Sequence, residues 1–262
     1  MLRRASAVRF SRISDGGRNR PLLVAVETTD GDEHDVYLKP SERRQLGVSG
    51  LVSEYMAACA AVDLGLPIPE AFCVDIDEIF IRSIPDVNVR ALLLDGSRLA
   101  FGSKIDGGGW RDWGEGDRLS TDQRLIALKI LVFDMLTGNQ DRSGNPSNVL
   151  IRNGELRIID HELAFRYAIG SHEPWRLGAC QALRHGDQGH VFAPALAGKQ
   201  LDFFAVRADW SRLTSARIMS YVTALPPEWG ARRDIAEGAA VLLSQAAERI
   251  DECLAEIQRA LS

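Results

Sequence analysis

The first third of the chain alternates short apolar runs with turn-forming residues. One run, PLLVAVE, is followed closely by the turn sequence Asp-Gly-Asp-Glu at 30–33. Apolar runs of this length, bounded by turn residues, are typical of β-strands. They predict five strands, at residues 7–13, 21–27, 35–39, 71–74 and 78–84.

Helical spacing of apolar residues dominates the remainder. A first helix is predicted at 51–64, because Gly65 follows it as a stop signal. Ser120 and Gln123 form a capping box before a second helix that ends at Gly138. Further helices are predicted at 174–184, 211–225 and 234–261, and the last has an apolar stripe typical of a helix packed on a core.

A polar, glycine-rich stretch separates the β-rich part from the helical part. Residues 95–116 are rich in Gly, Ser and charged residues and include three consecutive glycines. Such a composition is typical of a connection between two lobes. We therefore expect an α+β chain with a β-rich lobe at residues 1–104 and a mainly helical lobe at residues 105–262.

Composition narrows the class of protein. With 45% hydrophobic and 26% charged residues over 262 positions, the chain has the composition of a folded globular protein. Its net charge of −5 argues against a nucleic-acid coat, and no apolar run approaches the length that spans a bilayer. The four cysteines lie far apart, without metal-ligand spacing. We expect reduced thiols, a cytoplasmic protein and no membrane partner.

Candidate chemistry is concentrated between residues 138 and 165. A polar loop carries Asp141 and leads through Asn148 into the strand sequence Val-Leu-Ile. After an Asn-Gly turn, the strongest short hairpin signal, the chain returns and ends in Asp160. The hairpin brings Asn148 and Asp160 to one small site, whose oxygen ligands suit Mg²⁺. Asp141 can then orient an attacking hydroxyl group or accept its proton.

Each of these residues alone has a simpler interpretation. Asp, Asn, Gly and Ser before a hairpin are ordinary turn residues, and Asp160 could cap the following segment. The complete string is more specific: an aspartate, an asparagine directly before a β-branched strand, a tight hairpin, and then Ile-Ile-Asp.

This string resembles the catalytic and metal-binding loops of the protein-kinase-like superfamily, and most closely those of HipA-like kinases. Their Asn-x-Asp-Arg loop matches residues 139–142. The end of the string also resembles aminoglycoside phosphotransferases and phosphoinositide kinases. Upstream, Val-Tyr-Leu-Lys-Pro at 36–40 resembles the strand with the ATP-phosphate lysine, and Ser-Glu-Tyr at 53–55 resembles the helix whose glutamate pairs with it.

The resemblance implies a bilobal protein-kinase-like fold that binds ATP and Mg²⁺ between its lobes. It implies that Lys39 holds the ATP phosphates, that Glu54 positions Lys39, and that Asp141 is the catalytic base. It further implies that Asn148 and Asp160 ligate the metal ion.

The chain departs from the usual kinase pattern at two places. The metal asparagine usually lies five residues after the catalytic aspartate, where this chain has Pro146. Asn145 and Asn148 are the two alternatives, and we favour Asn148 because it directly precedes the strand. Asp160 is followed by His161-Glu162 rather than Phe-Gly. We assign His161 a structural hydrogen-bonding role, and Glu162 is an alternative second metal contact.

Two nucleotide contacts are weaker predictions. Gly16 and Gly17 lie between two predicted strands, where backbone N–H groups could cradle phosphates, although a surface turn explains them equally well. The adenine-contacting hinge is predicted at residues 101–104, which include Phe101 and Ser103, after a strand at 99–100.

The expected function is ATP-dependent phosphoryl transfer to a hydroxyl group, most closely that of a HipA-like Ser/Thr protein kinase. A small-molecule kinase of the aminoglycoside-phosphotransferase type and a nucleotide-binding pseudokinase module are the alternatives. Full-length HipA toxins carry an additional amino-terminal subdomain without a counterpart in these residues, so a toxin–antitoxin role is only suggested. Nucleic acid would be an indirect partner, through an antitoxin.

Overall fold

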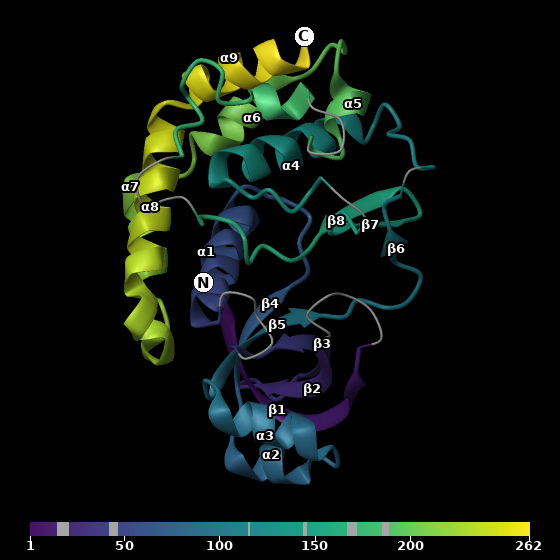
Figure 1. Cartoon of the computed structure of the whole chain (residues 1–262), viewed down its shortest axis with the longest axis vertical. Helices are drawn as coiled ribbons and strands as arrows, with labels where there is room; N and C mark the ends of the chain where they lie inside the picture. The colour runs from purple at the N-terminus through teal and green to yellow at the C-terminus, as the bar shows by residue number, and fades with distance from the viewer. Residues whose placement is uncertain (15–20, 42–46, 115, 144–145, 167–171, 185–188) are drawn as a thin grey trace.

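The computed structural model describes residues 1–14, 21–41, 47–114, 116–143, 146–166, 172–184 and 189–262. It has a β-rich amino-terminal part and a helical carboxyl-terminal part (Figure 1). The fold is therefore mixed α+β, as the sequence predicts. The division into lobes at residue 104 stays a prediction.

Five strands of the amino-terminal part form a closed barrel with the order β1-β2-β3-β5-β4. Neighbouring strands are antiparallel except for the β1–β4 pair, which is parallel. Closure removes the exposed edges that an open sheet would present. The strands are β1 (Arg3–Ile13), β2 (Leu22–Thr28), β3 (Glu33–Lys39), β4 (Ala71–Asp75) and β5 (Leu99–Lys104).

The register of β3 against β5 places the end of β3 in the core. Lys39 pairs with Phe101, and Leu38 pairs with Gly102. A Cβ atom at Gly102 would lie 2.8 Å from a methyl carbon of Val74 on β4, so glycine leaves room for the Val74 side chain. Residues 101–104 thus belong to β5, which is longer than the strand predicted at 99–100. The adenine contact predicted at these residues stays a prediction.

The predicted strand at 78–84 was also wrong. This segment forms helix α2 (Glu78–Ser83), which is followed by α3 (Val87–Asp95). The Asp77 side chain accepts a hydrogen bond from the Phe80 N–H at 2.6 Å and caps the helix. Phe80 and Ile81 are both buried whereas Ile79 is exposed, a helical pattern that the apolar composition concealed. Both helices cover one end of the barrel (Figure 1).

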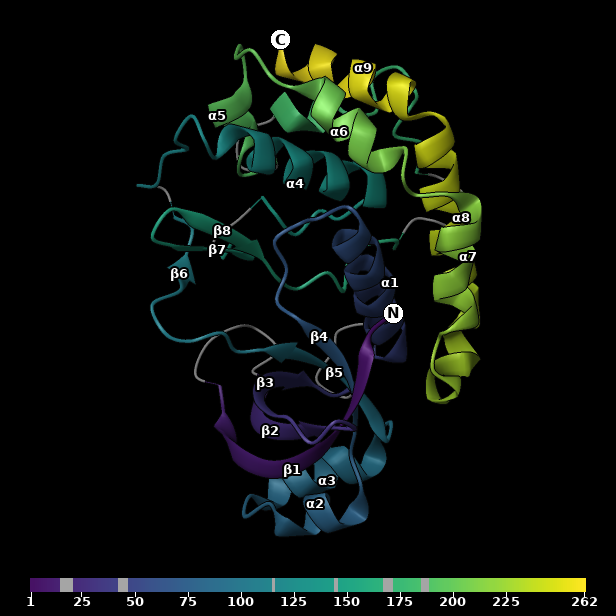
Figure 2. The same ribbon diagram turned by 180° about the vertical axis from the view of Figure 1, so that it is seen from behind.

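Helix α1 (Val48–Asp63) lies between the barrel and the helical part. All twelve residues from Gly50 to Ala61 are buried. Such burial on every side requires neighbours on every side, and the carboxyl-terminal helices supply them. Helix α8 runs alongside α1 in both ribbon views (Figure 2).

The predicted capping box is confirmed. The Ser120 N–H donates to the Gln123 side chain at 2.7 Å, and the Gln123 N–H donates to the Ser120 hydroxyl at 3.3 Å. Helix α4 (Arg124–Thr137) follows, and Gly138 ends it with a positive φ of 68°. This helix directs the chain into the polar loop.

The predicted hairpin is confirmed as well. Strands β7 (Val149–Arg152) and β8 (Glu155–Ile158) are antiparallel, and β6 (Arg111–Asp112) adds a third strand beside β7. Asn153 and Gly154 both have positive φ, as their turn requires. The apolar side chains of Val149 and Ile158 are fully buried, so this small sheet packs against the helical core.

The carboxyl-terminal helices differ in part from the prediction. The segment 174–184 is a series of turns with only a short 3₁₀ helix, and the long helix predicted at 234–261 is interrupted at Arg249. The elements are η2 (Gln181–Arg184), α5 (Ala193–Leu196), α6 (Phe203–Trp210), α7 (Ser215–Thr223), η4 (Pro227–Arg232), α8 (Arg233–Glu248) and α9 (Ile250–Leu261).

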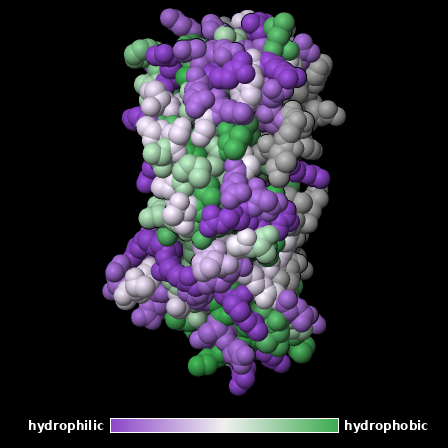
Figure 3. Space-filling model, turned by 90° about the vertical axis from the view of Figure 1, so that its left-hand side faces the viewer, coloured by the Kyte–Doolittle hydropathy of each residue, from purple (hydrophilic) through white to green (hydrophobic). Residues whose placement is uncertain are grey.

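The described residues form two hydrophobic clusters. One fills the barrel and extends to α2 and α3, and the other joins α1 to the helical part and to the hairpin. The larger core therefore crosses residue 104. On the face that α7 and α8 form, hydrophilic and hydrophobic residues are interspersed (Figure 3).

Two expectations from composition can be compared with the structure. All four cysteines are free and buried, as predicted. None of the helices in the described ranges combines the length and the apolar character needed to cross a bilayer.

Candidate active site

Lys39, Glu54 and Asp160 meet at the point where the barrel adjoins the helical part. The Lys39 Nζ atom lies 2.5 Å from Glu54 Oε1 and 3.1 Å from Asp160 Oδ1. These residues are far apart in sequence and come from β3, from α1 and from the segment after β8. The structure therefore brings together the lysine, the helix glutamate and the hairpin-end aspartate that the sequence singled out.

The ion pair between Lys39 and Glu54 is largely removed from water. The Glu54 side chain is 2% exposed and that of Lys39 is 11% exposed. The Lys39 Nζ atom also lies 5.9 Å above the centre of the Phe101 ring. A lysine in such surroundings has few conformations, so its ammonium group is oriented before any ligand binds.

Asp141 and Asn148 form the second pair of the site. Asn148 Nδ2 donates to Asp141 Oδ2 at 2.7 Å and contacts the Asp141 carbonyl oxygen at 3.3 Å. Both side chains are partly exposed. The loop between them thus folds back, and the asparagine that directly precedes β7 contacts the predicted catalytic aspartate.

The hairpin brings Asn148 beside the segment that carries Asp160. The Ile159 N–H donates to the Asn148 carbonyl oxygen at 3.0 Å, directly after the last strand pair. Asn148 and Asp160 have φ values of 55° and 61°, in the left-handed region that non-glycine residues seldom adopt. Strained backbone persists where its surroundings determine it, and it is frequent at functional sites.

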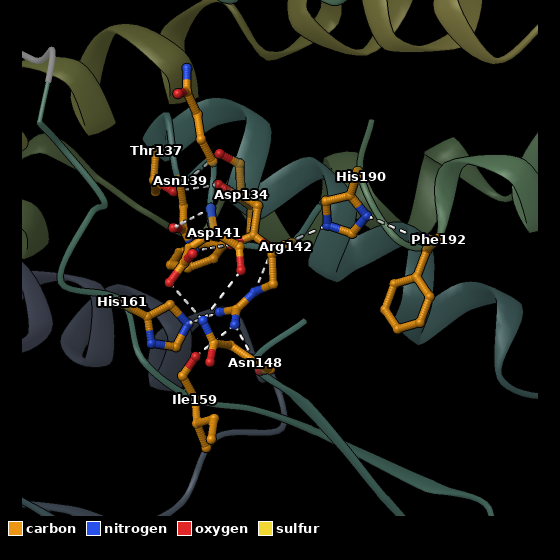
Figure 4. A network of polar contacts seen from close by, with 12 residues as sticks. Asp134, Thr137, Asn139, Asp141, Arg142, Asn148, Ile159, His161, His190 and Phe192 are labelled. Carbon is orange, nitrogen blue, oxygen red and sulfur yellow. Dashed lines mark hydrogen bonds and ion pairs between the residues drawn. The ribbon is translucent and has the colours of Figure 1, made fainter. Parts of the chain in front are cut away.

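A buried arginine determines these surroundings (Figure 4). Arg142 Nη1 donates to the carbonyl oxygens of Asn148 and Ile159, at 2.7 and 2.6 Å. Its Nε donates to Asp134 Oδ2 at 2.9 Å, and its Nη2 lies 2.8 Å from His161 Nε2. One guanidinium group therefore connects α4, the polar loop and both ends of the hairpin.

Asp134 is the counter-charge of this arginine. Burial by itself would raise the pKa of its carboxyl group, but the Arg142 guanidinium and a hydrogen bond from His190 lower the pKa below its usual range. His190 Nδ1 accepts from the Phe192 N–H at 3.2 Å, so its Nε2 carries the proton that is donated to Asp134. Asp134 is ionised at neutral pH and fixes Arg142.

His161 is fully enclosed next to the arginine. Burial and, next to it, the Arg142 charge lower its pKa to about 4, against the opposing effect of the Glu54 carboxylate. The imidazole is therefore neutral at pH 7. The hydrogen-bonding role assigned to His161 agrees with this geometry.

Sequence reasoning missed Asp134 and His190 altogether and gave Arg142 no role. Asp134 lies in an apolar helix pattern, and His190 lies 48 residues after Arg142 in the chain. The one available signal was the Asn-x-Asp-Arg motif. Its asparagine, Asn139, donates to Asp134 Oδ1 at 2.8 Å and thus belongs to the same network.

Several predicted site residues remain untested. Gly16, Gly17 and Asn145 lie outside the described residues. Phe101 is buried in β5, and Ser103 pairs with Tyr37 and Ala71 in the barrel. Glu162, the alternative metal contact, is buried.

The oxygen donors near the hairpin match the ligand set of Mg²⁺. Asp160 offers a carboxylate and Asn148 an amide oxygen, and the Asn148 amide nitrogen is oriented toward Asp141. Magnesium uses one or two such protein ligands and completes its shell with phosphate and water. Within the described ranges, no group of three or more His, Cys, Asp or Glu side chains could hold a metal ion without such help.

Comparison with known proteins assigns the chain to a family. No curated protein matches the chain. Among solved structures, the crystal structure of a Helicobacter pylori proinflammatory kinase, CtkA, is similar with a TM-score of 0.50 and 12% identity, over 100% of this chain and 96% of that one. Residues 10–259 match the HipA-like kinase family. The chain therefore belongs to the HipA-like kinases.

Proposed function

We propose that this kinase uses ATP and Mg²⁺ and transfers the γ-phosphate to a hydroxyl group, with Ser or Thr of a protein as the acceptor. The observation that carries the proposal is the contact of Lys39 with both Glu54 and Asp160, at 2.5 and 3.1 Å. In this proposal, a cation suited to phosphate lies next to a carboxylate suited to a metal ion. Phosphoryl transfer requires both positions to be filled, because its catalysis is mostly positioning and charge stabilisation.

Lys39 is assigned the nucleotide phosphates. Its ammonium group is oriented by the buried Glu54 carboxylate, so binding does not have to order a flexible side chain. Three N–H donors on one ammonium group can contact Glu54 and phosphate oxygens together. Glu54 thus acts by fixing Lys39.

Asp160 and Asn148 are assigned the metal ion. When bound, Mg²⁺ would neutralise charge on the phosphate oxygens. The chain contributes the two oxygen donors at the hairpin ends, and the backbone conformation of both residues is fixed by Arg142. Asn145, the alternative from the sequence, lies outside the described residues.

Asp141 is assigned the acceptor hydroxyl. Its Oδ2 atom accepts from Asn148, which orients the carboxylate. A carboxylate in this position orients the hydroxyl group and accepts its proton in the transition state. Its contribution therefore falls on transfer and not on nucleotide affinity.

The experiment compares Asp141→Asn with Asp160→Asn in a transfer assay with γ-labelled ATP and in melting curves. Mg-ATP at a hundredfold excess over Kd raises stability by about 2.7 kcal/mol, which raises Tm by several degrees for a chain of this size. Asp141→Asn is expected to keep this shift and lose transfer. Asp160→Asn is expected to lose transfer and the Mg²⁺-dependent part of the shift.

Asp30→Asn serves as the control, because this aspartate is 70% exposed and lies between β2 and β3. It should match the wild type in both assays. A wild-type protein without any nucleotide-dependent shift would contradict the proposal. The reverse pattern for the two aspartates would exchange their roles.

The acceptor is decided by a separate experiment. Incubation with a cell lysate and γ-labelled ATP, followed by mass spectrometry, is expected to find phosphate on Ser or Thr of protein. Phosphate on an added aminoglycoside or metabolite, with none on protein, would identify a small-molecule kinase. Intact Lys39, Asp141 and Asp160 argue against a pseudokinase.

A further inference from the structure

Arg142 belongs to the family motif, but it cannot touch nucleotide or acceptor. Its side chain is 1% exposed, as is that of Asp134, its ionic partner. Removing a guanidinium group from water is unfavourable unless hydrogen-bond acceptors surround it. The proposed function uses this residue only to fix the backbone at Asn148 and Asp160.

The acceptors of Arg142 are the backbone of the site itself. Two of its hydrogen bonds end on the carbonyl oxygens of Asn148 and Ile159, which directly precede β7 and Asp160 respectively. A third contact reaches His161, the residue after Asp160. Arg142 therefore fixes the chain before and after Asp160 and at Asn148.

Only one assignment of donor and acceptor is possible for the contact between Arg142 and His161. Arginine donates and cannot accept, so His161 Nε2 is the acceptor and the ring proton lies on Nδ1. His161 Nδ1 lies 3.9 Å from Glu54 Oε2. The other Glu54 oxygen binds Lys39, so the imidazole stands between the arginine and the Lys39–Glu54 pair.

These hydrogen bonds, together with the 3.9 Å approach of His161 to Glu54, which is longer than a hydrogen bond, form a closed path. It runs from Arg142 through His161 and Glu54 to Lys39, and Lys39 returns to Asp160, the neighbour of His161. Lys39 and the segment that carries Asp160 are thus connected twice, once directly and once through Glu54 and His161.

We propose that Arg142 and His161 are positioning residues, which make the Lys39–Glu54 pair and the Asp160 segment form as one unit. This inference rests on the proposed function of the same site. Arg142 fixes the backbone at Asn148 and directly before Asp160, and His161 links this part of the site to Glu54. The polar ring at position 161 is essential because a phenyl ring could neither accept from Arg142 nor direct an N–H dipole toward the Glu54 carboxylate, 3.9 Å away.

The structure offers a substitution that preserves shape. The His161 ring packs edge-on against Phe133, with centroids 5.9 Å apart, so an aromatic ring is accommodated there. His161→Phe keeps the ring and removes both polar contacts. His161→Gln keeps an oxygen acceptor for Arg142 and an N–H donor.

The experiment is a double-mutant cycle of His161→Phe with Glu54→Gln. We expect His161→Phe to lower kcat/KM at least tenfold in the wild-type background and less than threefold when Glu54 is already neutral. A residue that acts only on stability would give equal factors in both backgrounds. His161→Gln should recover kcat/KM to within threefold of the wild type.

The control is His172→Phe. His172 Nε2 donates to the Met135 carbonyl oxygen at 2.7 Å and has no contact with Glu54 among the described residues. Its effect should be the same in both backgrounds. Equal factors for His161→Phe in both backgrounds, or full activity of that variant, would overturn the proposal.

A second measurement separates this inference from the proposed function. The same cycle is followed by urea unfolding of the protein without nucleotide, where coupling between residues 161 and 54 is expected as a non-additive change in the midpoint. An inactive wild type would contradict the proposed function, and the unfolding cycle would still test the contact. Additive midpoints together with additive kcat/KM factors would overturn it.

Discussion

The Lys39–Glu54 pair lies on a strand and a helix, whereas Asp141, the partner asparagine and Asp160 lie on segments without regular structure. The pair is supported by packing, because α1 is buried over twelve consecutive residues. The loop residues are supported by a few charged hydrogen bonds around Arg142. Packing distributes stability over many contacts, so changes that conserve side-chain volume are tolerated best there. In the polar network of the loops, stability depends mainly on one residue, Arg142.

Helix α1 is also held from outside by the carboxyl-terminal helices. Asp63 at its end binds Arg217 Nε at 2.5 Å and accepts from the Tyr221 hydroxyl group at 2.5 Å. Trp229 Nε1 donates to the Leu99 carbonyl oxygen of β5 at 3.2 Å. The segment 214–232 therefore contacts both elements that adjoin Lys39. These contacts add to the packing that fixes α1.

The largest expected effect contrasts two arginines. Arg142→Met leaves Asp134 buried without its main counter-charge, which costs about 3–5 kcal/mol in the free energy of unfolding. Arg217→Met removes an ion pair whose arginine is 44% exposed, which costs about 0.2–1 kcal/mol. Urea unfolding of both variants measures the difference. Equal losses would show that the loops are not held by Arg142.

Lys39→Ala tests the pair itself. Transfer is expected to fall at least a hundredfold, equivalent to about 2.7 kcal/mol, because a preorganised charge is lost. The structure also predicts a loss of stability of about 1–3 kcal/mol, since the buried Glu54 carboxylate loses its partner. A transfer assay and urea unfolding measure the two effects. Arg9→Ala, at an exposed arginine of β1, is the control. More than half of wild-type transfer in Lys39→Ala would refute the assignment.

The contrast between regular elements and loops also explains which parts of the site could be predicted from the sequence. The lysine strand, the glutamate helix and the hairpin follow from local patterns. Asp160 could be named from the hairpin, whereas Lys39 and Glu54 were named from the resemblance to HipA-like kinases. The hairpin even predicted that Asn148 and Asp160 would lie together. These residues are set by elements whose hydrophobic period is visible in the chain.

The network around Arg142 could not be predicted in this way. A buried aspartate in an apolar helix, such as Asp134, gives no periodic signal, and His190 reaches it from another segment. Long-range polar contacts depend on the packed fold, which no local pattern encodes. The strand predicted at 78–84 failed for a related reason, because a short segment with three consecutive apolar residues, 79–81, fits a strand and a helix equally well.

A smaller effect is expected at Trp229, which is fully buried and packs edge-on against Tyr55. Trp229→Phe removes the donor to Leu99 and leaves a small cavity, which costs about 1–3 kcal/mol. Since α1 keeps its other neighbours, kcat/KM should fall less than tenfold at temperatures well below Tm. Melting curves and kinetics measure both. A loss of transfer as large as that of Lys39→Ala would mean that this one contact, and not packing as a whole, positions α1.

The smallest effect concerns pH at the end of α1. The hydrogen bonds from Arg217 lower the Asp63 pKa, burial opposes them, and the Tyr221 hydroxyl group and the amino-terminal charge add to the lowering. A lowered pKa in the folded state stabilises the fold above the unfolded-state value of about 3.9, and this contribution is lost as pH falls through the folded-state pKa. Unfolding free energy measured between pH 5 and 2 should therefore fall more steeply for the wild type than for Asp63→Asn. Parallel curves would show that packing alone holds α1. The Lys39–Glu54 pair would then depend on packing only, in contrast to the loop residues that depend on Arg142.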